Sequence, residues 1–385
     1  MRWGAEGAAV TGAAGVAIVA LLVAGSPLIG RADPAPVPTV RVLLLDRRGT
    51  VEIEPAGKPE AEVRLVRGGL AVDGRVQGAV LRYPGPGPHR VDGRRYRGAI
   101  EVQARREGVR VVDEVPLEAY VAGTLLGEVS ESWGEAVLEA QAVATRSYAL
   151  YRRARAGASA RDYDVEAGTL GQVYLGMDGE SDQVWRAVEE TRGEVLAFGG
   201  EAILAAFHGT AGGRTASAAE VWGEPLPYLV SLPVEGEDQS PDTYWRAEVS
   251  PGELEAALAR LGRSVGRVRA VEVAARTPSG RCAFLRIGGS RASAQVGGEA
   301  LRRALGEQTI RSTLFVVRPA GGGFVFAGSG RGHGVGMSQW GARVMAERGA
   351  GYRAILRHFY PGAELRRVAR TEADPAAFAE AGGSR

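Results

Sequence analysis

Residues 330–342, GRGHGVGMSQWGA, combine side chains that could bind a ligand with a backbone that must bend. Glycine recurs at every second position around His333, and Ser338, Gln339 and a tryptophan follow at once. Glycine permits backbone conformations that other residues avoid and lets a ligand approach closely. The G-x-G-x-x-G spacing of a dinucleotide-binding loop fails because its third glycine would be Val335. An indole can stack on a sugar ring while an amide bonds its hydroxyls, so the loop is interpreted as the wall of a saccharide cleft, with pure packing as the alternative.

Two further stretches gather polar and aromatic side chains. His208 lies in FHGTAGG, at the end of a predicted strand, and Tyr244 and Arg246 lie in SPDTYWR, after a Ser-Pro turn. The aromatic ring and the guanidinium of the second stretch could form a stacking surface or could simply pack. The chain has 4 histidines without metal-ligand spacing and 1 cysteine, Cys282, in a strand-like stretch. A metal site is therefore poorly supported, and Cys282 is interpreted as a buried apolar residue.

A carboxylate and a cation lie on or beside two predicted helices. Apolar residues at helical spacing predict a first helix from Leu117 that ends at Gly127, so that Glu128 follows directly. A second helix is predicted from about residue 132 to 157 and carries Arg146. On composition alone Glu128 could be a solvated helix-end residue, and Arg146 could form a surface ion pair with Glu139.

Composition and strand patterns define the fold class. The chain has 385 residues, 45% hydrophobic and 24% charged residues and a net charge of +2, as expected for a globular protein with no large basic surface for nucleic acid. Alternating β-branched residues broken by Gly and Pro predict strands over residues 39–112. The fold class is therefore α+β: a β-rich N-terminal part over 39–112, packed on a mixed core over 113–368 with a substrate cleft. Residues 369–385 have the composition of a disordered tail.

The N-terminal segment indicates export. Residues 7–30 carry no charge, with Arg2 before them and Arg31 after, and the run is long enough to cross a bilayer. Residues 1–32 are interpreted as a signal peptide or a retained membrane anchor, two alternatives that the pattern leaves open. Residues 33–38 form a Pro-rich linker. We therefore expect an extracytoplasmic protein, secreted or anchored, that contacts the membrane only through this segment.

Three stretches, in this order, resemble the SpoIID/LytB family, which comprises the stage II sporulation protein D group and the amidase enhancers. They are VPLEAYVAGTLLGEV with EAVLEAQAVATRSYAL, FHGTAGGRTASAAEVWGEPLPYL, and GRGHGVGMSQWGARVMAERGAGYRAILRHFYPG. The resemblance covers roughly residues 40–368. It implies a lytic transglycosylase that cleaves peptidoglycan between N-acetylmuramic acid and N-acetylglucosamine, preferably on strands without stem peptides. It also implies an alternative, a non-catalytic glycan-binding enhancer with an N-acetylmuramoyl-L-alanine amidase as partner.

The resemblance assigns roles to particular residues. The family's catalytic glutamate corresponds to Glu128, with valine where the family has methionine, and its active-site arginine corresponds to Arg146. Tyr244 and Arg246 match a tyrosine-plus-cation pair whose spacing drifts here. Some relatives hold zinc with two cysteines and two histidines near the loop of His208, but this loop has no cysteine, so neither a metal nor a cofactor is expected.

The implied chemistry needs one carboxyl group. Protonation of the leaving oxygen breaks the glycosidic bond, and the C6 hydroxyl of the muramic acid then closes on C1 to give a 1,6-anhydro sugar. Glu128 would donate and then accept the proton, with its pKa raised by partial burial. Arg146 would orient the sugar or stabilise the carboxylate, and His208, His333, Ser338 and Gln339 would contact substrate. Glutamine or asparagine in place of Asp113, Glu114, Glu118 or Glu131 should cause little loss. Sporulation, cell division and wall turnover all remain open as the process served.

Overall fold

The computed structural model describes residues 38–156, 162–168 and 172–368. Helices and strands alternate irregularly along these residues and form several separate sheets, which confirms the predicted α+β class. The predicted signal or anchor at 1–32, most of the linker and the tail at 369–385 lie outside the described residues. Within the described part of the chain, no helix is long and apolar enough to cross a membrane.

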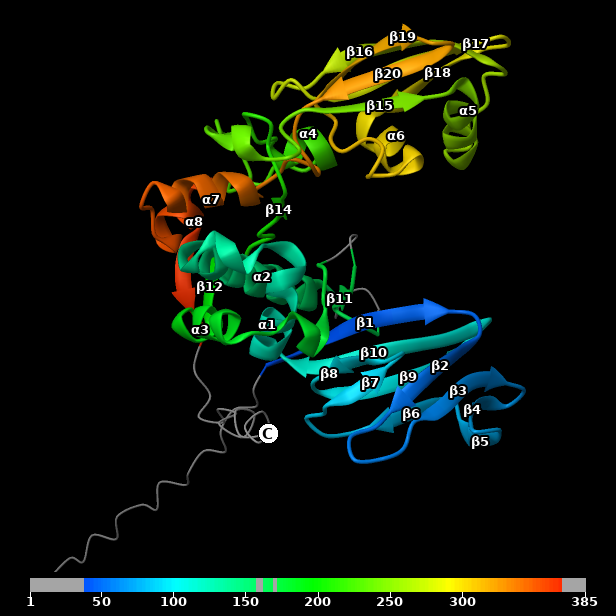
Figure 1. Ribbon diagram of the computed structural model, residues 1–385, viewed down its shortest axis with the longest axis vertical. Helices are drawn as coiled ribbons and strands as arrows, with labels where there is room; N and C mark the ends of the chain where they lie inside the picture. The colour runs from blue at the N-terminus through cyan, green and yellow to red at the C-terminus, as the bar shows by residue number, and fades with distance from the viewer. Residues whose placement is uncertain (1–37, 157–161, 169–171, 369–385) are drawn as a thin grey trace, which may run out of the picture.

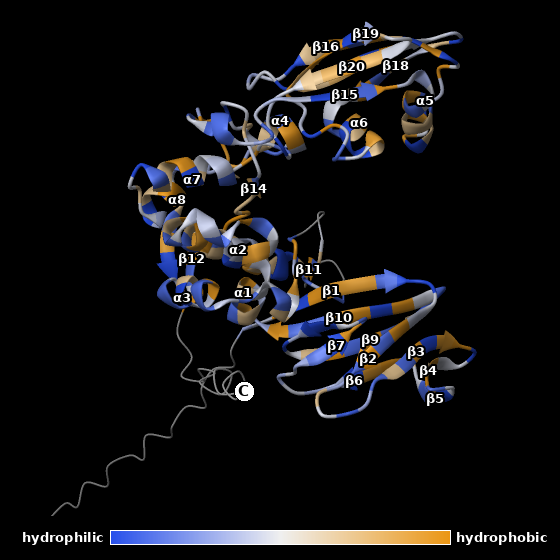
Figure 2. Cartoon of the chain, in the orientation of Figure 1, coloured by the Kyte–Doolittle hydropathy of each residue, from blue (hydrophilic) through white to orange (hydrophobic). Residues whose placement is uncertain are grey.

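Two sheets form the N-terminal part (Figure 1, blue to cyan), and their strands pair antiparallel except for β11, which runs parallel to β1. Alternating apolar residues on their strands point inward, as the period of two in a strand requires, and side chains such as Val42, Ile53 and Val102 are fully buried in one core. Figure 2 shows the apolar stretch on β1. The larger sheet has the order β5-β4-β3-β2-β7-β8, and the other has the order β11-β1-β10-β9-β6. The bounds are β1 Thr39–Arg47, β2 Thr50–Glu54, β3 Ala61–Val66, β4 Gly69–Val72, β5 Arg75–Gly78, β6 Val80–Tyr83, β7 His89–Val91, β8 Arg94–Tyr96, β9 Ala99–Arg105, β10 Gly108–Pro116 and β11 Val165–Glu166.

Helices α1 (Leu117–Glu128) and α2 (Glu135–Ala156) follow the last long strand and pack on each other. Pro116 precedes the first turn of α1, where its fixed φ suits a helix start. Side chains of α1, including Tyr120 and Leu125, belong to the same core as the two sheets. The β-rich part is thus joined to the helices by a shared apolar core, as predicted. The 3-10 turn η1 (Glu131–Trp133) separates the helices, and η2 (Gly176–Gly179) and α3 (Asp182–Glu190) pack against α1.

A second core lies beside α2 and joins segments far apart in sequence. Short strands β14 (Phe207–His208) and β21 (Met337–Ser338) run parallel, so the two glycine-rich stretches noted in the sequence are neighbours in the fold. The remaining elements of this region are β12 (Glu194–Phe198), β13 (Glu201–Ala202), α4 (Ala218–Trp222), η3 (Glu237–Gln239), α7 (Gln339–Glu347), α8 (Tyr352–Phe359) and β22 (Glu364–Arg367). Apolar residues of α2, α7 and α8 meet in this core.

Residues 245–328, within the chain between β14 and β21, form a third, sheet-rich region at the end of the molecule opposite the N-terminal sheets (Figure 1). It has its own apolar core, which includes Trp245, Leu285 and Phe326. The elements are β15 (Trp245–Val249), α5 (Pro251–Arg260), β16 (Val268–Arg276), β17 (Cys282–Gly289), β18 (Ser293–Gly297), α6 (Gly298–Leu305), β19 (Phe315–Ala320) and β20 (Gly323–Gly328). Cys282 is buried here, as its strand-like setting predicted. The sequence did not separate this region from the rest of 113–368.

Candidate functional site

Glu128 is the last residue of α1, one position further than the sequence predicted for the helix end. Its Oε1 accepts a hydrogen bond of 2.7 Å from the backbone N–H of Val173. Burial raises the pKa of Glu128 to about 7, although hydrogen bonds from Val173 and from the Gln339 side chain favour the ionised form. A carboxyl group with this pKa exists in both protonation states near neutral pH, which a group that must donate and then accept a proton requires.

The residues on either side of Val173 are held by side-chain hydrogen bonds, one to α1 and one to β10. Gln172 accepts a hydrogen bond of 2.6 Å from the hydroxyl of Tyr120, and the hydroxyl of Tyr174 donates one of 2.9 Å to Asp113. Gly127 permits this close packing, because a Cβ at that position would collide with the carbonyl oxygen of Val173. The donor to Glu128 is therefore fixed by contacts to α1 and to β10.

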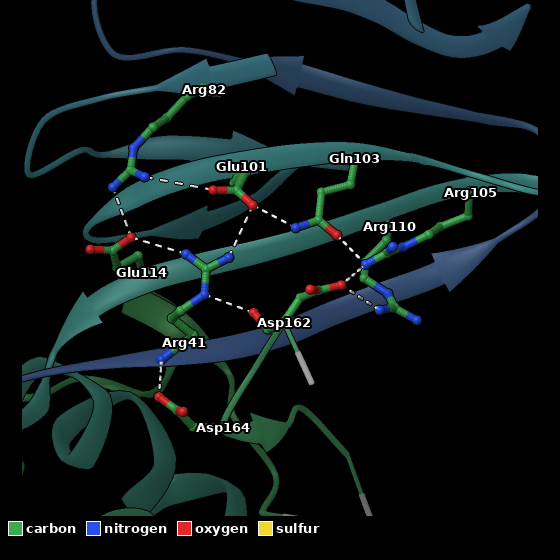
Figure 3. Close-up of polar contacts among 9 residues, drawn as sticks. All are labelled: Arg41, Arg82, Glu101, Gln103, Arg105, Arg110, Glu114, Asp162 and Asp164. Carbon is green, nitrogen blue, oxygen red and sulfur yellow. Dashed lines mark hydrogen bonds and ion pairs between the residues drawn. The ribbon is translucent and has the colours of Figure 1, made fainter. Parts of the chain in front are cut away.

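A network of ion pairs and hydrogen bonds joins Asp162 and Asp164, which precede β11, to the sheet that contains β1, β9 and β10 (Figure 3). Arg41 donates hydrogen bonds to Glu101 at 3.0 Å and Glu114 at 3.1 Å, and its backbone N–H donates to Asp164 at 2.9 Å. Asp162 accepts hydrogen bonds from Arg105 and Arg110. Since β11 follows directly and pairs with β1, the network anchors the chain on its way to Val173.

Gln339 is brought to Glu128 by the GRGHGVGMSQWGA stretch. Ser338 precedes it and caps α7, accepting a hydrogen bond from the N–H of Gly341 at 3.2 Å. The Ser338 hydroxyl also donates to the buried Glu237. The amide nitrogen of Gln339 donates to Oε1 of Gln141 at 3.4 Å, on α2. Ser338 and Gln339 were both predicted to contact substrate. Gln339 lies at Glu128, whereas the hydroxyl of Ser338 is engaged within the protein.

Arg146 faces a different carboxylate from the one that the resemblance implied. Its side chain is 0% exposed and forms an ion pair of 2.6 Å with Glu118, in the first turn of α1. Its Nε also contacts Glu118 at 3.1 Å, and Nη1 donates to the carbonyl oxygen of Glu194 at 2.9 Å. The guanidinium thus ties α2 to α1 and β12. Its partner is Glu118, neither Glu128 nor the Glu139 that helical spacing offered as an alternative.

His208 and His333 form a second group, with ring centroids 5.8 Å apart. Nδ1 of His208 lies 3.1 Å from the carbonyl oxygen of Val335, and Nδ1 of His333 accepts the N–H of Val335 at 3.0 Å. Burial lowers the pKa of His333 to about 4 and that of His208 well below its usual range, so both rings are neutral at neutral pH. Trp222, centred 5.4 Å from His333, adds an aromatic face. No group of three or more potential ligands for a metal ion occurs among the described residues.

Tyr244 and Arg246 lie at the start of the third, sheet-rich region. Tyr244 is 82% exposed and lines a pocket of about 470 Å³ together with Trp245, Leu314 and Phe315. Arg246 is exposed and pairs with Glu248 at 2.8 Å. Six of the predicted site residues therefore fall into three groups: Glu128 with Gln339, the two histidines, and the exposed Tyr244 with Arg246. Arg146 and Ser338 bond to other residues of the protein.

Sequence reasoning missed several residues around Glu128. Gln141 and Tyr148 lie within the second predicted helix, which was singled out only for Arg146. Gln141 contacts Gln339. Burial raises the pKa of Tyr148, and the nearby charge of Glu128 adds to this effect. Gln141 and Tyr148 both stand in the AQAVATRSY stretch, so the motif that pointed to Arg146 could have pointed to them. Val173 acts through its backbone, for which the sequence holds no side-chain signal.

The fold and this site define a mixed α+β protein whose Glu128 carboxyl group, at the end of α1, is partly buried and has a raised pKa. Comparison with known proteins identifies its family. Residues 105–198 match the family model described as stage II sporulation protein, SpoIID, and residues 223–336 match a domain of unknown function, DUF8618. The chain is 30% identical to a stage II sporulation protein D of Bacillus amyloliquefaciens over 281 residues, which cover 69% of this chain and 78% of the relative. The chain belongs to the SpoIID family.

Two other relatives are an uncharacterized protein and an amidase enhancer. The chain is 31% identical to an uncharacterized protein of Brachyspira hyodysenteriae over 275 residues, 71% of this chain and 73% of that protein. It is 28% identical to an amidase enhancer of Bacillus subtilis over 292 residues, 63% of this chain and 40% of that protein. The names of the relatives support a role related to the cell wall. The family-model match to SpoIID contains α1 and α2 with Glu128 and Arg146, whereas the separate apolar core around Trp245 falls in the domain of unknown function.

Proposed function

We propose that the protein is an exported peptidoglycan lytic transglycosylase. It cleaves the bond between N-acetylmuramic acid and N-acetylglucosamine in strands without stem peptides and leaves 1,6-anhydro-muramic acid ends. The observation that carries the proposal is the carboxyl group of Glu128, which is partly buried and receives hydrogen bonds, and whose pKa burial raises to about 7. Membership of the SpoIID family supports the cell wall as the site of action.

In the first step the protonated carboxyl of Glu128 donates its proton to the glycosidic oxygen. The bond from C1 of the muramic acid to that oxygen breaks, N-acetylglucosamine leaves with a 4-hydroxyl, and positive charge develops at C1. In the second step the C6 oxygen of the same muramic acid bonds to C1, and the carboxylate of Glu128 takes the C6 hydroxyl proton. The enzyme returns to its starting protonation state, and no water is consumed.

This route suits a site with one carboxyl group. Ordinary glycoside hydrolases use two carboxylates, one to protonate the leaving group and one to act as nucleophile or activate water. Burial and hydrogen bonds account for the pKa of Glu128, and no second carboxylate among the described residues contributes to it. The internal C6 hydroxyl replaces the second group.

The other predicted residues take revised roles in this proposal. Arg146 is a positioning residue, because its ion pair with Glu118 holds the first turn of the helix that ends in Glu128. Tyr244 offers an exposed aromatic face for a sugar ring, next to the charged Arg246. Trp222, which is 42% exposed, and the neutral ring of His333 beside it form an aromatic surface that can contact the glycan strand, whereas His208 is buried.

A non-catalytic role as an enhancer of an amidase is the second candidate, favoured by the similarity to the Bacillus subtilis amidase enhancer. Incubation of the purified protein with stem-peptide-free glycan, followed by mass spectrometry, separates the two. Products with 1,6-anhydro ends support the transglycosylase. Products with ordinary reducing ends would contradict this mechanism. Glycan binding and amidase stimulation without any cleavage would select the enhancer.

The proposed location outside the cytoplasmic membrane rests on the uncharged N-terminal run. Cell fractionation should find the protein in the envelope or the medium. Full-length protein confined to the cytosol would contradict it.

A further inference from the structure

We propose that Gln141 and Gln339 form a buried amide relay that aims a hydrogen-bond donor at the carboxyl group of Glu128. Both glutamines are then positioning residues of the reaction, and the inference rests on the catalytic role proposed for Glu128. It assigns Gln339 to the carboxyl group instead of the substrate.

The contacts run as a chain across three elements. The amide nitrogen of Gln141 donates to the hydroxyl oxygen of Thr145, one turn further along α2, at 3.3 Å. Oε1 of Gln141 accepts from the amide nitrogen of Gln339 at 3.4 Å. Gln339 in turn bonds the carboxyl of Glu128 at the end of α1. Gln141 is 0% exposed and Gln339 is 7% exposed, so water does not substitute readily for these partners.

The direction of the chain follows from the chemistry of the amide. A glutamine side chain has two N–H donors at one end and an acceptor oxygen at the other. Because Oε1 of Gln141 faces Gln339, the NH₂ group of Gln339 is the end turned toward α2, and its second hydrogen is available to Glu128. With both amides reversed, the oxygen of Gln339 would face an ionised carboxylate, which is unfavourable. Gln141 therefore selects the orientation of Gln339 that supports the ionised glutamate.

If a buried polar side chain only filled space, the protein would be more stable with an apolar residue of similar size in its place. The alternative to the relay is structural: the glutamines would link α7 to α2, which pack on each other. The two explanations differ in one property, the pKa of Glu128. A donor to the carboxylate lowers that pKa, and a structural link does not affect it.

The test is a titration of the Glu128 carboxyl group by carbon NMR in the full chain labelled at glutamate side-chain carboxyl carbons, with Glu128→Gln assigning the signal. Gln339→Met and Gln141→Met keep the side-chain volume and remove the amide. Methionine does not relieve burial, so both changes should raise the pKa of Glu128 above its value of about 7, by about one unit for Gln339→Met. Gln295→Met is the control, because it makes the same substitution on strand β18 of the third region, away from Glu128, and it should leave the pKa unmoved.

An unchanged pKa in Gln339→Met would overturn the proposal. A shift in Gln339→Met without one in Gln141→Met would overturn the relay. If Gln141→Met does not fold, Thr145→Val removes the acceptor at the far end and should give a smaller upward shift. The titration needs no cleavage, so a wild-type protein that fails to cut glycan would contradict the proposed function while leaving this measurement decisive for the relay.

Discussion

The backbone N–H of Val173 lies 2.7 Å from Oε1 of Glu128, a residue 45 positions earlier in the chain. Because the donor is a backbone N–H, an ordinary side-chain substitution at Val173 does not remove it from the proposed catalytic carboxyl. It depends on the packing of residues 172–175 against α1, where Gly127 leaves room for the carbonyl of Val173. The geometry of Glu128 is thus determined by a segment that has no catalytic side chain of its own.

Replacement of Glu128 by glutamine should abolish cleavage without unfolding the protein. The amide oxygen can still accept the N–H of Val173, but the group cannot donate and recover a proton. General acid–base catalysis typically contributes about 100- to 10,000-fold, and a lone carboxyl group should reach the upper end of this range. The assay is release of 1,6-anhydro-muramyl products from denuded glycan, with circular dichroism to check folding.

The matched control is Glu131→Gln, since Glu131 follows α1 closely and contacts Ser181 near the surface. It should keep near-normal turnover. Glu118, which the sequence analysis placed among the tolerant positions, is a poor control because it pairs with the buried Arg146. Near-normal turnover in Glu128→Gln would show that the single-glutamate mechanism is wrong.

The cleavage rate should fall as the pH rises through about 7, because the first step needs the protonated form of Glu128. The stability of the folded protein should also depend on the protonation of Glu128. Its folded-state pKa is raised above the ordinary value of 4.5, so its contribution to stability is fully present below pH 4.5 and is lost as the pH rises to about 7.

Glu128→Gln removes that titration, so the variant should not lose this stability as the pH rises. The difference in unfolding free energy, variant minus wild type, should therefore grow by roughly a few kcal/mol between pH 4.5 and about 7. Urea unfolding of both proteins at pH 4.5 and pH 8 measures the difference. If the unfolding free energies of both proteins change by the same amount between pH 4.5 and pH 8, burial does not raise the pKa of Glu128 in the folded protein.

The N-terminal strands and the first two helices could be predicted because their signals are local. Alternating valines mark a strand, and a proline before an apolar helical pattern marks a helix start. The position of Glu128 at a helix end was predicted within one residue. The chemistry of a single acid led us to expect its partial burial, and Glu128 is partly buried, with burial as the main reason for its raised pKa.

Partners across the fold were harder to predict. Arg146 lies at helical spacing from Glu139, but tertiary packing brings it to Glu118, 28 residues away. Val173 acts through a peptide group that every residue possesses, so its identity carries no information. The third apolar core could not be separated from the rest because its strands alternate in the same way as those before it.

Removal of the Arg146 side chain should lower stability more than it changes the chemistry. Arg146→Ala leaves the mostly buried Glu118 with the backbone N–H of Gly193 but without its guanidinium, and breaking a buried ion pair typically costs about 3–5 kcal/mol. Chemical denaturation should show this loss. Arg246→Ala, which removes an exposed ion pair with Glu248, should change stability little.

The cleavage rate of Arg146→Ala, measured at a temperature where the variant is folded, decides whether the arginine also touches substrate. A loss confined to stability fits a positioning role. A loss of several orders of magnitude in turnover by a fully folded variant would restore the direct catalytic role that the family resemblance implied.

Purified protein should contain no stoichiometric zinc. The loop of His208 has no cysteine, and the pKa of His208 is lowered mainly by burial and also by the nearby His333 and Arg281. A cation beside that guanidinium would be repelled. Metal analysis by mass spectrometry checks this, and zinc that disappears in His208→Ala would contradict it.

The exposed ring of Tyr244 should contribute to glycan binding and not to folding. It is 82% exposed and borders a pocket of about 470 Å³ with an apolar lining, so a sugar ring can stack on it without rearrangement of the core. Aromatic contacts of this kind contribute about 0.5–1.5 kcal/mol, which corresponds to about a 2- to 10-fold rise in KM for Tyr244→Ala with kcat nearly unchanged.

Phe284→Ala is the matched control, because Phe284 is also exposed, at 44%, and lies on β17 outside the lining of this pocket. Binding of denuded glycan to the Glu128→Gln protein, with and without Tyr244→Ala, measures the same contact without turnover. Equal affinity in both proteins would remove Tyr244 from the substrate site and leave it a surface residue of the third region.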